Sequence, residues 1–252
     1  MYSLNAIPTG TIYCSAITRI ARIGIGQDIG RVEPLPCYVW LLRNMDSGAC
    51  ILVDAGLPDT QSDVAPEQDR FVRTKDEQLL PALRRHGIGP DDLRCCILTH
   101  LHWDNAWGAR RLGKTPLLLQ RNEIRYAIAP YTLDRHCYDL NNDDVPFYTP
   151  MYWNMRFLDG DTRLDDDLSI VALPGHTPGS QGVLVNTPTG RIFLAGDIAC
   201  TRENLETGLP SGIRMDSRDA IQAMDRLEQM QKDGVTVIPS HDATAAQPFL
   251  LN

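Results

Sequence analysis

The sequence is short of positive charge. Its 252 residues include 24 Lys and Arg against 32 Asp and Glu, which gives a formal net charge of −8 at pH 7. Because binding to phosphate needs a basic patch, this balance excludes a nucleic-acid surface and disfavours docking on anionic lipid. We therefore expect no nucleic-acid partner and no membrane partner, and we read the acidity as a feature that promotes solubility.

Long apolar runs and a leader pattern are also absent. No run approaches the roughly 20 residues that cross a bilayer, and residues 1–10 lack a basic segment followed by an apolar one. The seven cysteines are odd in number, and no two of them have C-x-x-C spacing. These absences predict a reduced, cytoplasmic protein. No sharp linker divides the chain, so we expect a single domain over residues 1–252.

Short apolar segments between turn residues predict strands in both halves of the chain. They cover residues 38–42, 51–53, 95–98, 116–119, 155–158, 168–173, 181–185, 192–195 and 235–238. Helical spacing predicts helices at 76–86, from about 121, and at 217–232, the last with Asp216 as its N-cap and an apolar stripe of Ile221, Met224, Leu227 and Met230. The pattern predicts an α+β fold in which two sheets pack face to face with helices outside.

Residues from about 130 to 155 form an insert that is rich in aromatics, Asp, Asn and Pro and has no clean period. We expect a long loop or an irregular helical segment, of a length that usually carries function. Aromatic side chains here would give a substrate pocket an apolar wall. The candidate pocket residues are Trp103, Tyr131, His136, Tyr138, Tyr148 and Tyr152.

Four histidines and two aspartates lie at the ends of predicted strands or in Gly/Pro turns, where a rigid sheet can aim side chains at one point. In the segment after strand 95–98, His100, His102 and Asp104 alternate, so all three can face one centre. The others are His176, Asp197 and His241. Imidazole and carboxylate are good zinc ligands, and the set predicts a metal centre.

Five motifs resemble those of the metallo-β-lactamase superfamily and stand in the same order. They are residues 52–56 (LVDAG), 99–108 (THLHWDNAWG), 174–180 (PGHTPGS), 195–197 (AGD) and 240–241 (SH). The resemblance implies the metallo-β-lactamase fold, a four-layer αββα sandwich of two mixed β-sheets. The length, the aromatic insert and the motif sequences are most similar to the N-acyl-homoserine lactonase branch. Members of that branch are often dimers, so the resemblance implies a homodimer as one possible assembly.

The resemblance also implies roles for the metal residues. His100, His102 and His176 would hold a first Zn²⁺ firmly, and Asp104 and His241 would hold a second, with Asp197 bridging both; other divalent metals would fit the same ligands. Asp54 would orient a ligand or cap a turn.

Two positions depart from the family pattern. Dinuclear members usually carry histidine where this chain has Asn105, and a carboxamide oxygen is a poorer zinc ligand. We therefore predict a weak or partial second metal, unless Asn105 only donates a hydrogen bond and the other ligands suffice. The lactonases carry a tyrosine where this chain has Cys200, which could pack, donate weakly or bind metal. A tyrosine of the insert could supply the missing hydroxyl.

The resemblance implies a hydrolase in which a metal-bound hydroxide opens a lactone or cleaves a related carboxylic ester. Asp104 would shuttle the proton to the leaving group. Three alternatives stay open: a thioesterase resembling hydroxyacylglutathione hydrolase, a mononuclear iron oxygenase resembling persulfide dioxygenase, and a non-catalytic metal-binding relative. The substrate is a small-molecule ester or lactone in the leading hypothesis, and metal identity discriminates the oxygenase.

Overall fold

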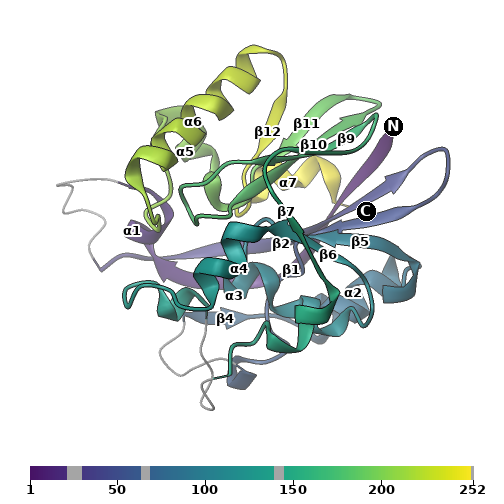
Figure 1. Cartoon of the computed structure of the whole chain (residues 1–252), viewed down its shortest axis with the longest axis horizontal. Helices are drawn as coiled ribbons and strands as arrows, with labels where there is room; N and C mark the ends of the chain where they lie inside the picture. The colour runs from purple at the N-terminus through teal and green to yellow at the C-terminus, as the bar shows by residue number, and fades with distance from the viewer. Residues whose placement is uncertain (22–29, 64–68, 139–144, 251–252) are drawn as a thin grey trace.

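Two mixed β-sheets form the centre of the computed structural model, which describes residues 1–21, 30–63, 69–138 and 145–250 (Figure 1). The seven-stranded sheet has the order β4-β1-β2-β3-β5-β6-β7. The strands β3, β5, β6 and β7 run parallel to one another, and the pairings β4–β1, β1–β2 and β2–β3 are antiparallel. Its strands are β1 (Tyr2–Ser15), β2 (Val32–Asn44), β3 (Cys50–Val53), β4 (Arg70–Val72), β5 (Leu93–Ile97), β6 (Leu117–Gln120) and β7 (Met155–Leu158).

The second sheet has five strands in the order β12-β11-β10-β9-β8. Only β11 and β12 are parallel within it. Its strands are β8 (Thr162–Asp165), β9 (Leu168–Ala172), β10 (Gln181–Thr187), β11 (Gly190–Leu194) and β12 (Thr236–Ile238). All nine predicted strands are therefore present. Eight agree with their expected ends to within two residues, whereas β2 begins six residues before the predicted strand at 38–42.

Helices cover the outer faces of both sheets. The α-helices are α1 (Ala16–Arg19), α2 (Leu79–Arg85), α3 (Trp103–Ala106), α4 (Arg121–Ala127), α5 (Arg202–Thr207), α6 (Ser217–Lys232) and α7 (Ala243–Ala246). Short 3₁₀ turns occupy Gln61–Asp63, Lys75–Glu77, Pro90–Asp92, Trp107–Arg111, Arg135–Tyr138, Thr149–Asn154, Gly196–Ile198 and Gln247–Phe249. None of the helices in the described part of the chain has the length and apolar character that a membrane crossing requires.

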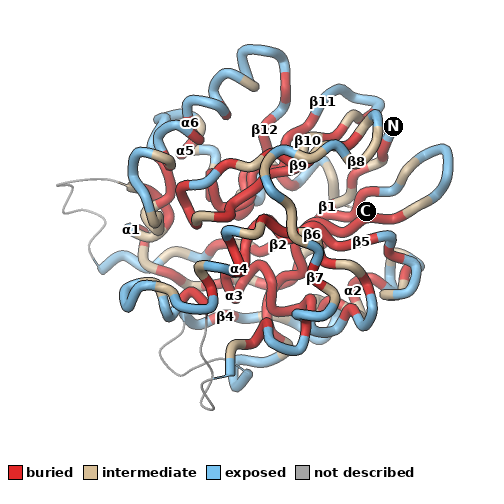
Figure 2. Tube along the Cα trace, in the orientation of Figure 1, coloured by how far each residue is buried: buried red, intermediate tan, exposed pale blue. Residues whose placement is uncertain are grey.

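Three clusters of buried side chains define the four layers. Between the sheets, residues such as Trp40 and Ile97 of the first sheet pack against Val183 and Leu194 of the second. On the outer face of the first sheet, a larger cluster includes side chains of α2, α3 and α4. On the outer face of the second sheet, α6 packs over β11 and β12. Figure 2 shows this burial as continuous buried segments through the strands. The predicted αββα sandwich of the metallo-β-lactamase fold is confirmed.

Helix α6 confirms the predicted apolar stripe at Met224, Leu227 and Met230 and departs from it at Ile221. Asp216 caps the helix as predicted, because its carboxylate accepts hydrogen bonds from the backbone N–H groups of Arg218 and Asp219. The buried face, however, comprises Ala220, Ala223, Met224 and Leu227, and Ile221 is 53% exposed. The two alanines let the helix lie close to the sheet, so the contact face is rotated toward them.

Two elements of the first half also differ from expectation. The long strand β1 was not predicted, because Pro8 and Gly10 interrupt its alternation; the register shifts there, and Gly10 takes a left-handed φ of 126°. The predicted helix 76–86 is shorter, beginning at Leu79. Pro81 then lies in the first turn, where a missing backbone N–H leaves no hydrogen bond unmade.

Candidate metal centre

The three predicted site-one histidines converge at one point. His100 and His102 lie in the segment between β5 and α3, and His176 lies in the turn between β9 and β10. All three side chains are buried, and their ligand atoms lie within 4.8 Å of one another. His102 Nδ1 is 3.0 Å from His176 Nε2. Tetrahedral zinc with bonds of about 2.0–2.1 Å separates its nitrogen ligands by about 3.3 Å, so these two nitrogens are spaced to share one ion.

Asp104, Asp197 and His241 form a second buried group beside the first. Asp197 faces both groups with different oxygens. Its Oδ2 lies 3.6 Å from His176 Nε2 and 4.0 Å from His100 Nε2, while its Oδ1 lies 3.3 Å from His241 Nε2. Asp104 Oδ2 is 3.7 Å from the same nitrogen of His241. One carboxylate thus stands between two sets of donors, as a bridging ligand would.

Hydrogen bonds on the outer side of the imidazoles fix which nitrogen faces the centre. His176 Nδ1 is 2.8 Å from the carbonyl oxygen of Ile213, and His241 Nδ1 is 3.0 Å from that of Pro36. A carbonyl only accepts, so both Nδ1 atoms carry a proton, and the Nε2 of neutral His176 offers a lone pair. Burial would lower the pKa of His241, but attraction to Asp197 raises it well above its usual value, so its Nε2 also carries a proton until an ion displaces it. The buried Nε2 of His100 has no hydrogen-bond partner among the described residues. These lone pairs fit a cation.

Asp54 acts on the centre through Thr99. Its Oδ1 accepts a 2.7 Å hydrogen bond from the backbone N–H of Thr99, and its Oδ2 accepts one of 2.9 Å from the Thr99 hydroxyl. The same hydroxyl oxygen lies 3.0 Å from His100 Nδ1. With its single proton given to Asp54, the hydroxyl accepts from His100 and leaves Nε2 as the ligand atom. Asp54 itself adopts a left-handed φ of 58°, which short polar residues tolerate.

Burial sets the protonation of the two groups in the metal-free chain. It lowers the pKa of His100 to about 3 and that of His102 and His176 below the usual value, so these imidazoles are neutral and ready to bind at neutral pH. Burial, followed by the charge of Asp197, raises the pKa of Asp104 to about 7. Burial alone would raise the pKa of Asp197, yet attraction to His241 holds it well below its usual value.

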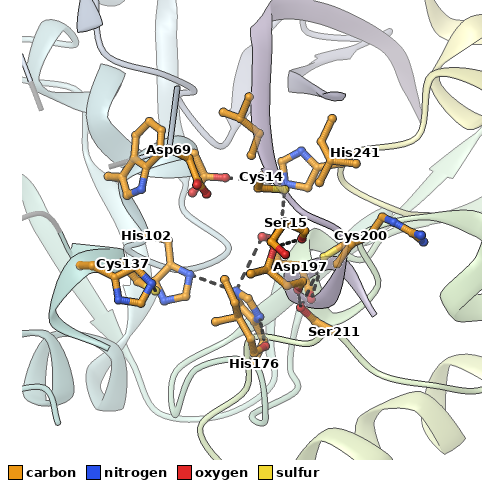
Figure 3. Close-up of a pocket in the computed structure, with 18 residues that line it drawn as sticks. Cys14, Ser15, Asp69, His102, Cys137, His176, Asp197, Cys200, Ser211 and His241 are labelled. Atoms are coloured by element: carbon orange, nitrogen blue, oxygen red, sulfur yellow. Dashed lines mark hydrogen bonds and ion pairs between the residues drawn. The ribbon is translucent and has the colours of Figure 1, made fainter. Parts of the chain in front are cut away.

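A cavity opens directly onto both groups (Figure 3). Its apolar lining includes Ile12, Leu35, Trp103 and Ile213. Cys14, Cys137 and Cys200 also line it. Asp69, His136 and Arg19 supply the polar wall away from the two groups, and Figure 3 shows the Asp69 carboxylate turned toward the cavity.

The guanidinium of Arg19 is already paired. It lies 2.7 Å from Glu33 and 2.5 Å from Glu203, and its side chain is 7% exposed. It is the sole lysine or arginine among the described residues that line the cavity. The cavity therefore has no unpaired basic side chain in that part of the chain with which to bind an anionic substrate group.

Most aromatic residues of the insert lie elsewhere than predicted. Among the candidate pocket residues, Trp103 and His136 line the cavity. Tyr138 and Tyr148 are buried behind its wall, where their hydroxyls donate to Glu123 Oε1 and to the carbonyl of Ala127. Neither hydroxyl is therefore available to replace one missing at position 200.

The remaining two pocket candidates are surface residues. Tyr131 is 73% exposed and Tyr152 is 46% exposed, and neither lines the cavity. Part of the insert, residues 139–144, lies outside the described residues. In the rest, Tyr138, Phe147 and Tyr148 fill the core beside α4 rather than forming the wall of the cavity. The aromatic residues of the turn Thr149–Asn154 are exposed, and Met151 is its buried residue.

Asn105 and Cys200, the two departures from the family pattern, are both buried. The backbone carbonyl of Asn105 accepts from the N–H groups of Ala55 and Gly56, but its side-chain Nδ2 has no hydrogen-bond partner in the described chain. The Cys200 thiol lies 3.5 Å from Ser211 Oγ at the cavity wall. Burial, followed by the charge of Asp197, raises the pKa of this thiol to about 12, so it stays protonated.

Two residues that support the centre, Thr99 and Glu123, were not predicted from the sequence. Thr99 directly precedes His100, and its position was the available signal. Glu123 lies in the first turn of α4, where an acidic residue ordinarily faces water and interacts with the helix N-terminus. It is nevertheless 0% exposed and accepts four hydrogen bonds, three from the segments that carry the candidate ligand histidines and one from the Tyr138 hydroxyl.

Comparisons with known proteins agree with this geometry. A sequence profile described as the metallo-beta-lactamase superfamily matches residues 32–241. An N-acyl homoserine lactonase of Bacillus cereus is 29% identical over 225 residues, which are 84% of this chain and 84% of that protein. The N-acyl homoserine lactonase AttM of Rhizobium radiobacter is 28% identical over 261 residues, covering 98% of this chain and 95% of the relative.

Solved structures give the same result in three dimensions. The fold of an N-acyl homoserine lactone hydrolase with the product N-hexanoyl-L-homoserine bound at its catalytic metal center superimposes with a TM-score of 0.79. Its sequence is 26% identical, and the match covers 97% of this chain and 95% of that one. The match therefore extends over nearly the whole of both chains.

Proposed function

Because the chain belongs to the metallo-beta-lactamase superfamily, we propose that it is a metal-dependent hydrolase that opens a lactone or cleaves a related carboxylic ester. The observation that carries the proposal is the pair of buried donor groups with Asp197 between them at the floor of a cavity. The lactonase relatives support the choice of a cyclic ester. When bound, a divalent cation supplies an acidified water and a Lewis acid for the carbonyl.

The residues of this chain would bind the cations and transfer the proton. His100, His102 and His176 would hold the first cation, and Asp104, Asp197 and His241 the second. Ring opening leaves an alkoxide that needs a proton. Asp104 lines the cavity, and burial raises its pKa to about 7 in the metal-free chain. We assign to its carboxylate the removal of a proton from the attacking water and the delivery of that proton to the leaving oxygen.

The cavity favours a neutral ester over a glutathione thioester. A thioesterase of that class needs a basic contact for the carboxylates of glutathione. Arg19, the sole lysine or arginine among the described cavity residues, is held by Glu33 and Glu203, and Asp69 adds negative charge. The described lining therefore offers no free guanidinium or ammonium group to a glutathione carboxylate, whereas a lactone carries no charge and needs none.

The test begins with metal content and a substrate panel. Zinc-loaded protein is assayed by acid release on neutral lactones, linear esters and glutathione thioesters, before and after chelation. We expect hydrolysis of lactones, loss of activity in chelator and recovery with Zn²⁺. Activity that survives complete metal removal, or turnover confined to thioesters, would overturn the proposal. Purified protein that carries iron and consumes oxygen would point to the oxygenase alternative.

We further propose that zinc fills the first group firmly and the second weakly. The second group offers three His or Asp ligands in the described chain, and the fourth position of the family pattern is Asn105. Asn105→His should tighten the second ion at least about tenfold (about 1.4 kcal/mol) in a zinc titration. Asn122→His, at an exposed position of α4, adds an imidazole away from the centre as the control. Two equally tight ions in the unmodified chain would contradict this part.

A further inference from the structure

We propose that Glu123 is a positioning residue that holds all three imidazoles of the first group at once. The inference rests on the proposed metal-binding role of His100, His102 and His176. Glu123 belongs to helix α4 and does not reach the cavity, so it would act through other residues rather than on a substrate.

The carboxylate of Glu123 is fully used by donors. Its Oε1 accepts from the backbone N–H of Leu101 at 2.9 Å and from the Tyr138 hydroxyl at 3.1 Å. Its Oε2 accepts from the Thr177 hydroxyl at 2.5 Å and from the backbone N–H of Gly179 at 3.1 Å. A carboxylate has about four acceptor positions. Four donors therefore match the ionised form, which needs no proton of its own to complete them.

Three of the four donors, Leu101, Thr177 and Gly179, belong to segments that carry a proposed ligand. Leu101 stands between His100 and His102, so its N–H fixes the peptide that joins these two ligands. Thr177 directly follows His176. Gly179 lies so close to α4 that an added Cβ would come within 2.3 Å of the Glu123 Cβ. The two ligand segments, which are far apart in sequence, are thus fastened to the same side chain.

The fourth donor reaches the remaining face of His102. The ring of Tyr138 lies 5.1 Å from the His102 imidazole, with the two planes at 78°. His102 Nε2 is buried and has no hydrogen-bond partner among the described residues. Packing against Tyr138, which the bond to Glu123 holds in place, therefore supports the orientation that turns Nδ1 toward the centre.

The burial of Glu123 distinguishes it from an ordinary helix residue. It is 0% exposed, and no ion pair with it occurs among the described residues. Burying a carboxylate without a cation is costly unless hydrogen bonds compensate. A dication held by the adjacent imidazoles would interact favourably with this charge, which gives a metal site a reason to keep it.

The test compares metal affinity with stability. Glu123→Gln keeps the shape but replaces one acceptor oxygen by an amide, so one pair of donors loses its partner. We expect the dissociation constant of the first Zn²⁺ to rise about tenfold or more in competition with a chromogenic chelator. The visible spectrum of the Co²⁺-loaded protein should also change, because the ligand geometry relaxes.

Two tyrosine variants form a matched pair. Tyr138→Phe removes one bond to Glu123 and should weaken the first ion about two- to fivefold. Tyr148→Phe removes the 2.6 Å bond to Ala127, at the far end of the same helix, and should lower thermal stability without changing metal affinity.

The outcomes separate the two proposals. If Glu123→Gln folds and binds Zn²⁺ and Co²⁺ as the unmodified chain does, the inference is wrong while the proposed function stands. If Glu123→Gln does not fold, Tyr138→Phe decides, and affinity equal to that of Tyr148→Phe overturns the inference. If the unmodified chain binds no ion, the proposed function fails first.

Discussion

The hydroxyl of Thr99 orients His100, one of the proposed metal ligands. Its oxygen lies 2.9 Å from Asp54 Oδ2 and 3.0 Å from His100 Nδ1, and the side chain is buried. Thr99→Val keeps the volume and removes both bonds. His100 can then rotate or change tautomer, so that Nε2 no longer offers a lone pair to the centre.

The expected magnitude follows from what is lost. Removing the outer partner of a ligating imidazole typically lowers metal affinity by about 10–100-fold, or about 1.4–2.8 kcal/mol. The variant also leaves Asp54 Oδ2 and His100 Nδ1 unpaired in a buried place. Each unpaired group costs about 1–3 kcal/mol, so the metal-free variant should also unfold at lower urea concentration.

The assay separates the two effects. Zinc affinity is measured at pH 7.5 by competition with a chromogenic chelator, and stability by urea unfolding of the metal-free chain. Thr115→Val is the control, because Thr115 is also buried and its hydroxyl donates to the carbonyls of Leu112 and Pro90, away from the centre. It should lose stability alone. A Thr99→Val chain that binds zinc within twofold of the unmodified chain would refute the reasoning.

Two further predictions concern the other buried groups near the centre. Cys200→Ser should keep kcat within about threefold, and iodoacetamide should not label Cys200 in the folded chain, because burial raises the pKa of this thiol to about 12; a loss of activity beyond tenfold would show that the sulfur takes part. Burial raises the pKa of Asp54 from 3.8 to about 8, so the folded metal-free chain keeps a proton that the unfolded chain releases above pH 4. The contribution of Asp54 to stability should therefore fall as pH rises from about 4 to about 8, by up to about 1.4 kcal/mol per pH unit, and Asp54→Asn should remove this contribution from the slope measured by urea unfolding; an unchanged slope would contradict the assignment.

Sequence reasoning predicted the candidate ligands that the structure brings together, because they lie where the local sequence pattern is strong. His100, His102 and Asp104 follow a short apolar strand, and His241 follows another, so strand prediction alone placed them at sheet ends. The partners of these ligands could not be found in the same way. Glu123 lies in a polar helix start and has an ordinary local sequence, and only the packing of α4 against two distant loops buries it.

For the aromatic insert, the sequence predicted burial but not the surface against which the side chains pack. Its composition indicates that side chains will be buried, but it does not indicate which surface they will bury. Phe147 stacks on Trp107 with ring centroids 4.8 Å apart, and Tyr148 bonds to α4, so these rings complete the core. The hydrophobic effect is non-directional, so composition alone does not distinguish an aromatic side chain that lines a pocket from one that fills the core.

Buried polar atoms without hydrogen-bond partners in the described chain cluster at the candidate metal centre, a feature that the sequence does not reveal. Six buried side-chain atoms in the described residues have no hydrogen-bond partner, and four of them belong to His100, His102, Asn105 and Asp197. A buried polar atom without a partner costs about 1–3 kcal/mol, and folded chains leave few of them. These four atoms lie together at the centre rather than being spread through the core. A bound cation and its water could pair with them there and offset the free-energy cost of burying them. Asn105 fits this reasoning differently from the imidazoles, because its unpaired atom is an N–H donor and repels a cation. Its natural partner is an oxygen, of water or of a substrate, beside the second group.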